Sequence, residues 1–524
     1  MRRTLRIFFF LSLTAAILMA ASLGRHKQPK LLIAIVVDQF RYDYLLRFHD
    51  DYHSGLARLL DQGAVFTDAH YIQAATVTAV GHSTFLSGAP PSISGMIANE
   101  WYDRESGKSV TSVSDAGQKL VGGLPQAAGS SPKRLLVSTV ADELKMRNPD
   151  SHAIGISIKD RSAILPAGRM ADAAYWYDND TNHWVTSTYY RHDLPEWVAN
   201  VNEQHLYRNF IGAEWRPVDA PSGSGEPFCT TVNGTAARFC GSLEATPWGN
   251  EMIEEFAERA LDGESLGRHR GTDVLAVSFS SNDYIGHQIG PDDPAIRDIC
   301  IRTDRLLGKL MAYADKIVGE GNTLVVLTAD HGVAPLPELN EARKMPGGRT
   351  VDYRLTKRIT DALVKKFGPG DWLLPGAPAM MPYLNVNLIR KRGLDPEQFE
   401  RTAAEAAAGE DHIARVYTRH DLMSGNVQKD PIGQAMSLGF YGPRSGDLVI
   451  LQEPYYVTDA TGTGHGTPYG YDAHVPVIFL GPEIKAGEYR EKIAVNDIAP
   501  TLAALLDIEA PSGSIGRILR EMLP

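Results

Sequence analysis

Several apolar runs of strand length recur along the chain, and most of them lead into a side chain that can bind a metal ion or an anion. The runs are 31–37 before Asp38, 152–158 before Lys159, 274–279 before Asp283, 323–327 before Asp330, and 475–480 before Gly481. Continuous β-branched and aliphatic runs indicate strands buried on both faces, as in a parallel sheet covered by helices. Because ligands of open α/β sheets gather at the carboxyl ends of the strands, the sequence predicts a polar site at that edge.

Helical patterns separate these runs, at 251–261, 295–318, 354–367 and 396–408. Near the C-terminus we expect Asp497 to cap a further helix, with Pro500 in its first turn and an apolar face of Leu502, Leu505 and Leu506. This alternation predicts an α/β fold with a mostly parallel central sheet flanked by helices.

Two regions interrupt the alternation. Residues of about 165–245 are rich in Tyr, Trp, Asn, Asp, Gly and Ser, and residues of about 335–450 contain many Gly and Pro. We expect both to be insertions that form a cap over the sheet edge, within one catalytic domain of residues 25–524. A separate domain for each region is the alternative.

The N-terminus predicts export from a bacterial cell. A basic segment, 1–6, precedes an apolar stretch, 7–21, and small residues at Ala20, Ala21 and Ser22 offer a cleavage site. The stretch is shorter than the ~20 apolar residues of a membrane span and suits a signal peptide, residues 1–24. We therefore expect a periplasmic or secreted protein with no stable membrane span after signal removal, an uncleaved signal anchor being the alternative.

Net charge and cysteine content limit the binding partners and the cysteine chemistry that we expect. The net charge is −11, with both signs interspersed, which argues against binding to a nucleic-acid backbone or an anionic membrane. Cys229 and Cys240 lie close together and are expected to pair as a disulfide in an oxidising compartment, leaving Cys300 over. Their spacing matches no cysteine-based zinc motif. We expect a monomer that acts on small molecules.

Asp and His residues occur in patterns that suit a metal site. Asp283 and His287 are four apart, so on one helical turn, or in a tight loop after a strand, both can face the same ion. Asp330 and His331 are adjacent, and His465 stands between two glycines. Mixed Asp and His ligands favour zinc or a similar ion. A plain surface turn is the alternative for the segment of His465, and taken alone neither Asp/His pair establishes a metal site.

Thr78 is the candidate nucleophile. Residues 78–88 are expected to begin a helix, whose N-terminal N–H groups and dipole would face a bound phosphoryl group. Coordination of a threonine hydroxyl by a metal favours its alkoxide form. Thr76, Ser83 and Thr84 are rival hydroxyls, and helix capping is the alternative role for any one of them.

Together these segments resemble a known family. The resemblance rests on residues 37–39, 75–82, 95–102, 157–168, 282–287, 328–332 and 464–469. In their order and spacing the chain resembles the alkaline phosphatase superfamily, and within it the zinc-dependent phosphate monoesterases of the PafA type, over nearly the whole mature length. Nucleotide pyrophosphatases/phosphodiesterases are related to that group.

The resemblance implies two zinc ions and their ligands. One zinc would be held by Asp283, His287 and His465. The other would be held by Asp38, Asp330 and His331, and it would also bind the oxygen of Thr78, the implied nucleophile. His474 is a rival to His465 but lacks the flanking glycines.

The resemblance also implies contacts to the transferred phosphoryl group from Asn99, Lys159 and Arg161. On an extended segment Lys159 and Arg161 would point the same way, and both cations suit the charge of a monoester dianion. We therefore expect an alkaline phosphatase that hydrolyses a broad range of phosphate monoesters through a phospho-threonine intermediate.

A phosphodiesterase of the same superfamily is the main alternative. A sulfatase is disfavoured because no Cys/Ser-x-Pro-x-Arg pattern is present at the nucleophile segment, and a non-catalytic zinc-binding protein is disfavoured because nucleophile and ligands occur together.

Overall fold

The structure, a computed structural model, describes residues 28–220, 225–230, 242–376 and 378–524. The predicted signal segment 1–24 and Cys240 lie outside these residues, so the expected disulfide with Cys229 stays a prediction. Cys300 is a free, buried thiol. Within the described ranges, no helix combines the length and apolar character that a membrane crossing needs.

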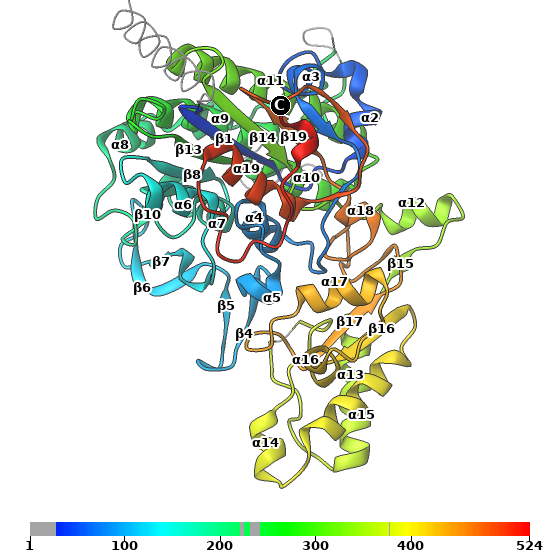
Figure 1. Cartoon of the computed structure of the whole chain (residues 1–524). Coiled ribbons are helices and arrows are strands. Elements are labelled where there is room, and N and C mark those ends of the chain that lie inside the picture. The colour runs from blue at the N-terminus through cyan, green and yellow to red at the C-terminus, as the bar shows by residue number, and fades with distance from the viewer. Residues whose placement is uncertain (1–27, 221–224, 231–241, 377) are drawn as a thin grey trace, which may run out of the picture.

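An eleven-stranded sheet forms the centre of the molecule (Figure 1). Its middle strands run parallel in the order β14 (Thr323–Thr328), β1 (Leu31–Val37), β13 (Asp273–Phe279), β8 (Ala153–Ser157) and β9 (Ala173–Asp178). Every residue of β1, β13 and β14 is buried, which explains their uninterrupted apolar sequence. The predicted α/β fold is confirmed, with a parallel centre.

The margins of the sheet include antiparallel strands. On one side β19 (Val477–Leu480) is antiparallel to β14, and it is followed by β2 (Ala64–Phe66) and β20 (Gly487–Tyr489). On the other side the order continues through β10 (His183–Ser187), β6 (Ser114–Val121) and β7 (Ala128–Ser130). The apolar run 475–480 is therefore a strand, as expected, but it runs against the central strands.

Helices cover both faces of the sheet. One set consists of α3 (Gly55–Gln62), α9 (Pro247–Gly263) and α11 (Pro294–Val318), and the other of α4 (Thr78–Ser87), α6 (Val140–Arg147), α7 (Asp160–Ala167) and α19 (Ile498–Leu506). Two neighbouring residues of β9 point to opposite faces of the sheet. Tyr175 contacts Phe256 of α9, whereas Trp176 belongs to the hydrophobic cluster that contains Ala163 of α7. Alternation along a strand places successive side chains on opposite faces.

Asp497 does not cap a helix in the expected way. It stands at the start of α19, but its carboxylate accepts hydrogen bonds from the backbone N–H groups of Ala494 and Arg517 instead of from α19. A short 3-10 turn, Val495–Asp497, precedes the helix and gives Asp497 a helical backbone conformation. An N-cap side chain needs a non-helical backbone to reach back to the first turn, so the capping prediction was wrong.

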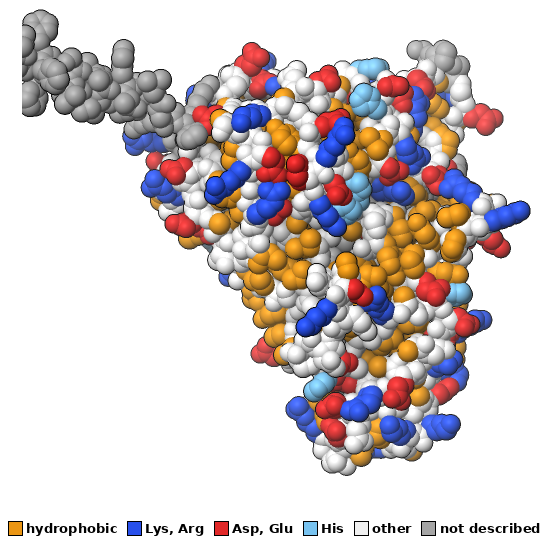
Figure 2. Space-filling view, turned by 45° about the vertical axis from the view of Figure 1, so that its right-hand side comes forward, with side chains coloured by type: hydrophobic (Ala, Val, Ile, Leu, Met, Phe, Trp, Pro, Cys, Tyr) orange, Lys and Arg blue, Asp and Glu red, His pale blue; other side chains and the backbone are white. Residues whose placement is uncertain are grey.

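A second lobe extends from the main body (Figures 1 and 2). It contains α13 (Asp352–Phe367), α14 (Val386–Lys391), α15 (Pro396–Ala408), β16 (Ile413–Thr418) and β17 (Leu448–Gln452). Leu363, Trp372 and Phe399 belong to a hydrophobic cluster of its own. On the face in Figure 2, acidic and basic side chains are interspersed, as the sequence composition suggests.

The lobe is joined to the body next to the segment that carries Asn99. Arg444 donates to the carbonyl oxygens of Gly95 (2.6 Å) and Arg134 (2.8 Å), and its guanidinium lies over the ring of Trp101. Within the other expected insertion, β9 and β10 are part of the central sheet. The division into a catalytic domain with insertions at about 165–245 and 335–450 stays a prediction.

Candidate active site

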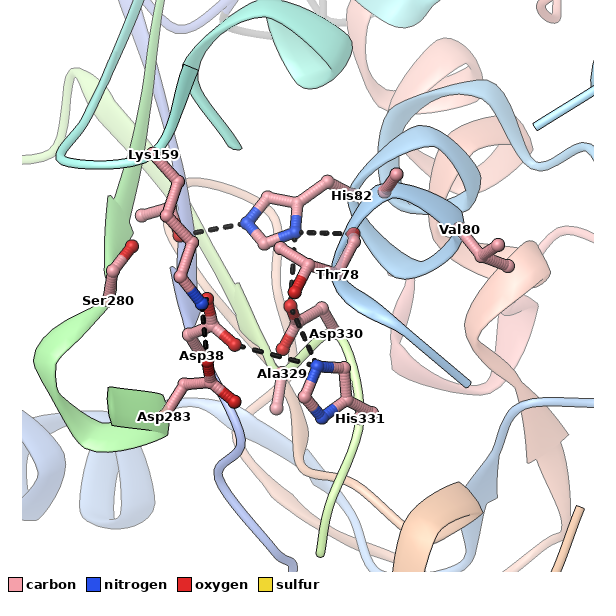
Figure 3. Close-up of polar contacts among 12 residues, drawn as sticks. Asp38, Thr78, Val80, His82, Lys159, Ser280, Asp283, Ala329, Asp330 and His331 are labelled. Carbon is pink, nitrogen blue, oxygen red and sulfur yellow. Dashed lines mark hydrogen bonds and ion pairs between the residues drawn. The ribbon is translucent and has the colours of Figure 1, made fainter. Parts of the chain in front are cut away.

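The carboxyl edge of the parallel strands brings four predicted residues together (Figure 3). Asp38, Lys159, Asp283 and Asp330 follow β1, β8, β13 and β14 within a few residues. Val37 is level with Phe279, and Ser157 is level with Ser278, so these strands end at the same edge of the sheet. The edge therefore carries three carboxylates and one ammonium group.

A first group of possible metal ligands consists of Asp283, His287 and His465. The first two lie on α10 (Ser281–Ile289), where His287 Nε2 is 3.2 Å from Asp283 Oδ1. His465 Nε2 lies 3.2 Å from His287 Nε2 and 3.6 Å from Asp283 Oδ1. The spacing of four between Asp283 and His287 thus corresponds to one helical turn.

The rival His474 lies elsewhere, with Asp68 and His70. Its ring stacks on that of His70 with 4.5 Å between centroids and 14° between planes, and its Nε2 is 3.0 Å from the carbonyl oxygen of Thr67. His465, rather than His474, is therefore the histidine that joins Asp283 and His287.

A second group consists of Asp38, Asp330 and His331, all fully buried. His331 Nε2 lies 3.4 Å from Asp330 Oδ2 and 3.6 Å from Asp38 Oδ1. The two groups are in contact, because the rings of His331 and His465 stack with 3.5 Å between centroids.

Backbone carbonyl oxygens fix how the three histidines face the groups. Nδ1 of His287 contacts Thr463 O at 2.8 Å, Nδ1 of His465 contacts Thr76 O at 2.8 Å, and Nδ1 of His331 contacts Gly332 O at 2.9 Å. A carbonyl accepts only from a protonated nitrogen, so in the neutral rings the lone pair is on Nε2. This arrangement is typical of metal-binding histidines, whose second nitrogen donates to a carbonyl or carboxylate.

The donor atoms of the second group fit a divalent cation. Asp38 Oδ1, Asp330 Oδ2 and His331 Nε2 are buried and make no hydrogen bond to a residue that the structure describes, although Asp330 Oδ2 lies 3.2 Å from Nδ1 of His82. Buried polar atoms without partners are rare and costly, and these three acceptors face one another. A cation between them would satisfy all three, and the mixture of oxygen and imidazole donors suits zinc.

The carboxyl groups of the two metal-ligand groups have pKa values shifted in opposite directions. Burial and the neighbouring Asp330 raise the pKa of Asp38 to about 7. Burial acts against ionisation of Asp283 as well, but Lys159 and His287 outweigh it and hold the pKa of this carboxyl well below its usual range. Burial lowers the pKa of His287, yet the contact with Asp283 overrides it and raises the pKa to about 9.

Thr78 is the first residue of α4 and is buried beside Asp330 (Figure 3). The helix predicted to begin there is present, and it ends at Gly88 in the left-handed conformation. The rival hydroxyls all donate to backbone carbonyls: Thr76 to Thr467, Ser83 to Val80 and Thr84 to Ala89. Thr78 Oγ1 has no such bond to a described residue, so it is the hydroxyl left available at the helix N-terminus.

Asn99 faces the same helix end. Its Oδ1 accepts the backbone N–H of Ala79 at 2.8 Å. The carboxamide oxygen is thereby engaged, and the NH₂ group is the part of Asn99 that can donate to an anion beside Thr78.

Lys159 and Arg161 do not lie on an extended segment, contrary to the expectation. Lys159 precedes α7, and Arg161 is in the first turn of that helix. Lys159 Nζ lies 2.6 Å from Asp38 Oδ2 and 2.5 Å from Asp283 Oδ2, so it joins the two metal-ligand groups. Arg161 Nε is buried without a hydrogen-bond partner among the described residues and remains able to donate.

Sequence reasoning gave no role to two buried residues at this site, Gln39 and His82. The amide group of Gln39 contacts Asp283, and its backbone N–H contacts Asp330. His82 Nδ1 lies 2.9 Å from Thr78 O and 3.2 Å from Asp330 Oδ2 (Figure 3). Their positions within the segments of Asp38 and Thr78 were the one signal available.

Comparison with known proteins gives consistent matches. The profile of the type I phosphodiesterase / nucleotide pyrophosphatase family matches residues 32–472. A Myroides odoratus protein named calcium-transporting ATPase is 35% identical over 523 residues, 95% of each chain. Alkaline phosphatase PhoV of Synechococcus elongatus is 34% identical over 518 residues, 95% of this chain and 93% of the other.

Alkaline phosphatase PafA of Elizabethkingia meningoseptica is 33% identical over 541 residues, 98% of each chain. A crystal structure of PafA superimposes with a TM-score of 0.88, covering 95% of this chain and 99% of that one. The similarity therefore extends over both the sheet and the second lobe.

Proposed function

The chain belongs to the type I phosphodiesterase / nucleotide pyrophosphatase family, and we propose that it is an exported alkaline phosphatase that hydrolyses phosphate monoesters through a covalent phospho-threonine at Thr78. Its alkaline phosphatase relatives indicate a phosphoric monoester hydrolase. The observation that carries the proposal is the meeting of the Thr78 segment with both Asp/His groups at one sheet edge. His465 links them directly, since its Nδ1 bonds the carbonyl of Thr76.

Two zinc ions are the proposed cofactors. Asp283, His287 and His465 would hold one, and Asp38, Asp330 and His331, with the Thr78 oxygen, would hold the other. When bound, such ions supply Lewis-acid stabilisation of the oxygens that enter and leave phosphorus.

The residues of the chain would position and stabilise the phosphoryl group. The Thr78 oxygen attacks phosphorus in line, the bond from phosphorus to the leaving oxygen breaks, and the proton of the Thr78 hydroxyl passes through solvent to that oxygen, which departs as an alcohol. Water then attacks the phospho-threonine and restores the hydroxyl, releasing phosphate. Charge on the non-bridging oxygens would be met by the N–H groups at the start of α4 other than that of Ala79, by the NH₂ of Asn99 and by the guanidinium of Arg161.

The two cationic side chains, Lys159 and Arg161, favour monoesters over diesters as substrates. A monoester dianion presents more non-bridging charge than a diester, in which one of these oxygens carries a second organic group. The free Nε of Arg161 and the ammonium of Lys159, which lies between Asp38 and Asp283, match that charge. Nothing in this arrangement requires a particular leaving group, so we propose a broad range of small-molecule phosphate esters and a monomeric enzyme in the periplasm or outside the cell.

The proposal is tested by kcat/KM of the zinc-loaded mature protein for p-nitrophenyl phosphate against a matched aryl phosphodiester. We expect a large monoester preference that shrinks in the Lys159→Ala/Arg161→Ala double variant. A diester preference in the unaltered protein would instead make it a phosphodiesterase of the same family, with the two cations serving another purpose.

A further inference from the structure

Gln39 contacts both metal-ligand groups at once. It is 2% exposed and directly follows Asp38 at the end of β1. Its Nε2 donates to Asp283 Oδ1 at 2.7 Å, in the first group. Its backbone N–H donates to Asp330 Oδ1 at 3.1 Å, in the second group.

The backbone of Gln39 adopts an unusual conformation at this point. Its φ is +60°, in the left-handed region that residues with a side chain seldom adopt. Such a residue persists only where its surroundings hold it there, and these positions concentrate at functional sites. The turn allows the N–H of Gln39 to reach Asp330 while its side chain reaches α10.

Gly286 provides the space that the Gln39 amide occupies. This glycine is buried in α10, between Asp283 and His287, and a methyl group built on it would overlap Gln39 Oε1. Glycine is the poorest helix former after proline, so its presence in the middle of α10 needs a packing reason. Contact with Gln39 supplies that reason.

We propose that Gln39 is a positioning residue whose side-chain amide orients the Asp283 carboxylate for the first metal site, while its backbone N–H holds Asp330 of the second. The proposal rests on the proposed function in one respect, that both groups hold metal. The side chain of Gln39 would act on the first site alone, because the hydrogen bond to Asp330 comes from the Gln39 backbone and survives a change of side chain. The Asp283 oxygen that Gln39 contacts, Oδ1, is the one that faces His287 and His465.

The test is zinc binding without substrate, measured on chelator-treated, folded protein by competition with a chromogenic chelator. Gln39→Met keeps the length of the side chain and removes its donor. We expect zinc affinity to fall about 10- to 100-fold at one site and to stay unchanged at the other, as for other contacts that orient metal ligands. Asp283→Asn and Asp330→Asn variants identify which binding step belongs to which site.

Two further variants separate positioning from folding. Gly286→Ala should displace the Gln39 side chain and weaken the same site. Gln73→Met is the matched control, since Gln73 is also fully buried and donates to Thr84 at 3.0 Å but touches neither group; it should bind both zinc ions as the unaltered protein does.

Unchanged affinity at both sites in Gln39→Met, or equal loss at both, would overturn the role of Gln39. A protein that binds no zinc before any substitution would contradict the two-metal proposal itself, which distinguishes the two failures.

Discussion

The imidazole of His331 stacks on that of His465 with 3.5 Å between ring centroids and 15° between planes, although each belongs to a different group of metal ligands. His331 follows β14, and His465 lies in a loop between β18 (Tyr456–Val457) and α18 (Gly470–Ala473). The ring contact means that the two groups form one continuous site.

Replacement of Thr78 by Ala should lower kcat for p-nitrophenyl phosphate at least about 1000-fold, because it removes the proposed nucleophile. Thr76→Val is the matched control, since the Thr76 hydroxyl donates to Thr467 and is not free to attack. Acid quenching during turnover should trap a phosphorylated peptide that contains Thr78. Full activity in Thr78→Ala would contradict the mechanism.

Zinc affinity should increase with pH. A metal ion binds deprotonated ligands, and the pKa of His287 in the metal-free chain is raised to about 9 while that of Asp38 is raised to about 7. Above pH 7 the proton on His287 still competes with the ion, so affinity should rise up to about tenfold per pH unit until pH 9 and then level off. Competition titrations across this range, together with the proton release on binding, measure the effect. An affinity independent of pH between pH 7 and pH 9 would mean that His287 carries no proton in the metal-free protein in this range.

Arg161→Ala should lower kcat/KM for a phosphate monoester by about 100-fold or more, because a charge-assisted donor to the phosphoryl group is lost. The effect on an aryl phosphodiester should be smaller. Arg169→Ala is the control, since Arg169 lies just beyond the other end of α7 and donates to the carbonyl of Leu135. Equal losses for both substrates would mean that Arg161 does not discriminate between them.

Asp304→Ala should destabilise the fold by about 3 kcal/mol, because it leaves four backbone donors, that of buried Leu56 among them, without their acceptor. The buried carboxylate of Asp304 accepts the N–H groups of His53 (3.0 Å), Ser54 (3.0 Å), Leu56 (2.6 Å) and Ala57 (3.3 Å) and so caps the start of α3. Thermal unfolding of the metal-free protein tests this.

Asp315→Ala is the control for this effect. It lies on the same helix, α11, and its partner is the side chain of Arg58, in a partly exposed ion pair of 2.7 Å. Its loss should cost no more than about 1 kcal/mol. A similar shift in Tm for both variants would show that the capping of α3 adds little.

Local patterns predicted the framework closely. The runs 31–37, 274–279 and 323–327 are β1, β13 and β14, and the pattern at 396–408 coincides with α15. These elements follow from periodicity, because burial on both faces or on one stripe selects apolar residues at fixed spacing. The capping role expected for Asp497 failed because a preceding 3-10 turn changed the backbone at that position, which no side-chain pattern signals.

The candidate site was predictable in parts. The spacing of Asp283 and His287 indicated a shared ion, and that spacing is local to one helix. The grouping of Asp38 with Asp330 and His331, and the choice of His465 over His474, came from family resemblance rather than from spacing. Gln39 and His82 received no role because their contacts with Asp330 join segments that are distant in sequence; Gln39 and Asp330 are 291 positions apart.

The sequence by itself therefore determined five strands of the central sheet, the longest helices and the kinds of side chain that follow those strands, since these depend on short-range periodicity. The tertiary structure alone decided which of those side chains meet, because parallel strands bring their carboxyl ends to one edge whatever their separation along the chain. It also imposed the left-handed conformation of Gln39, which costs an isolated residue roughly 1–2 kcal/mol. Contacts with Asp283 and Asp330 offset that local preference, and only the folded chain can provide them.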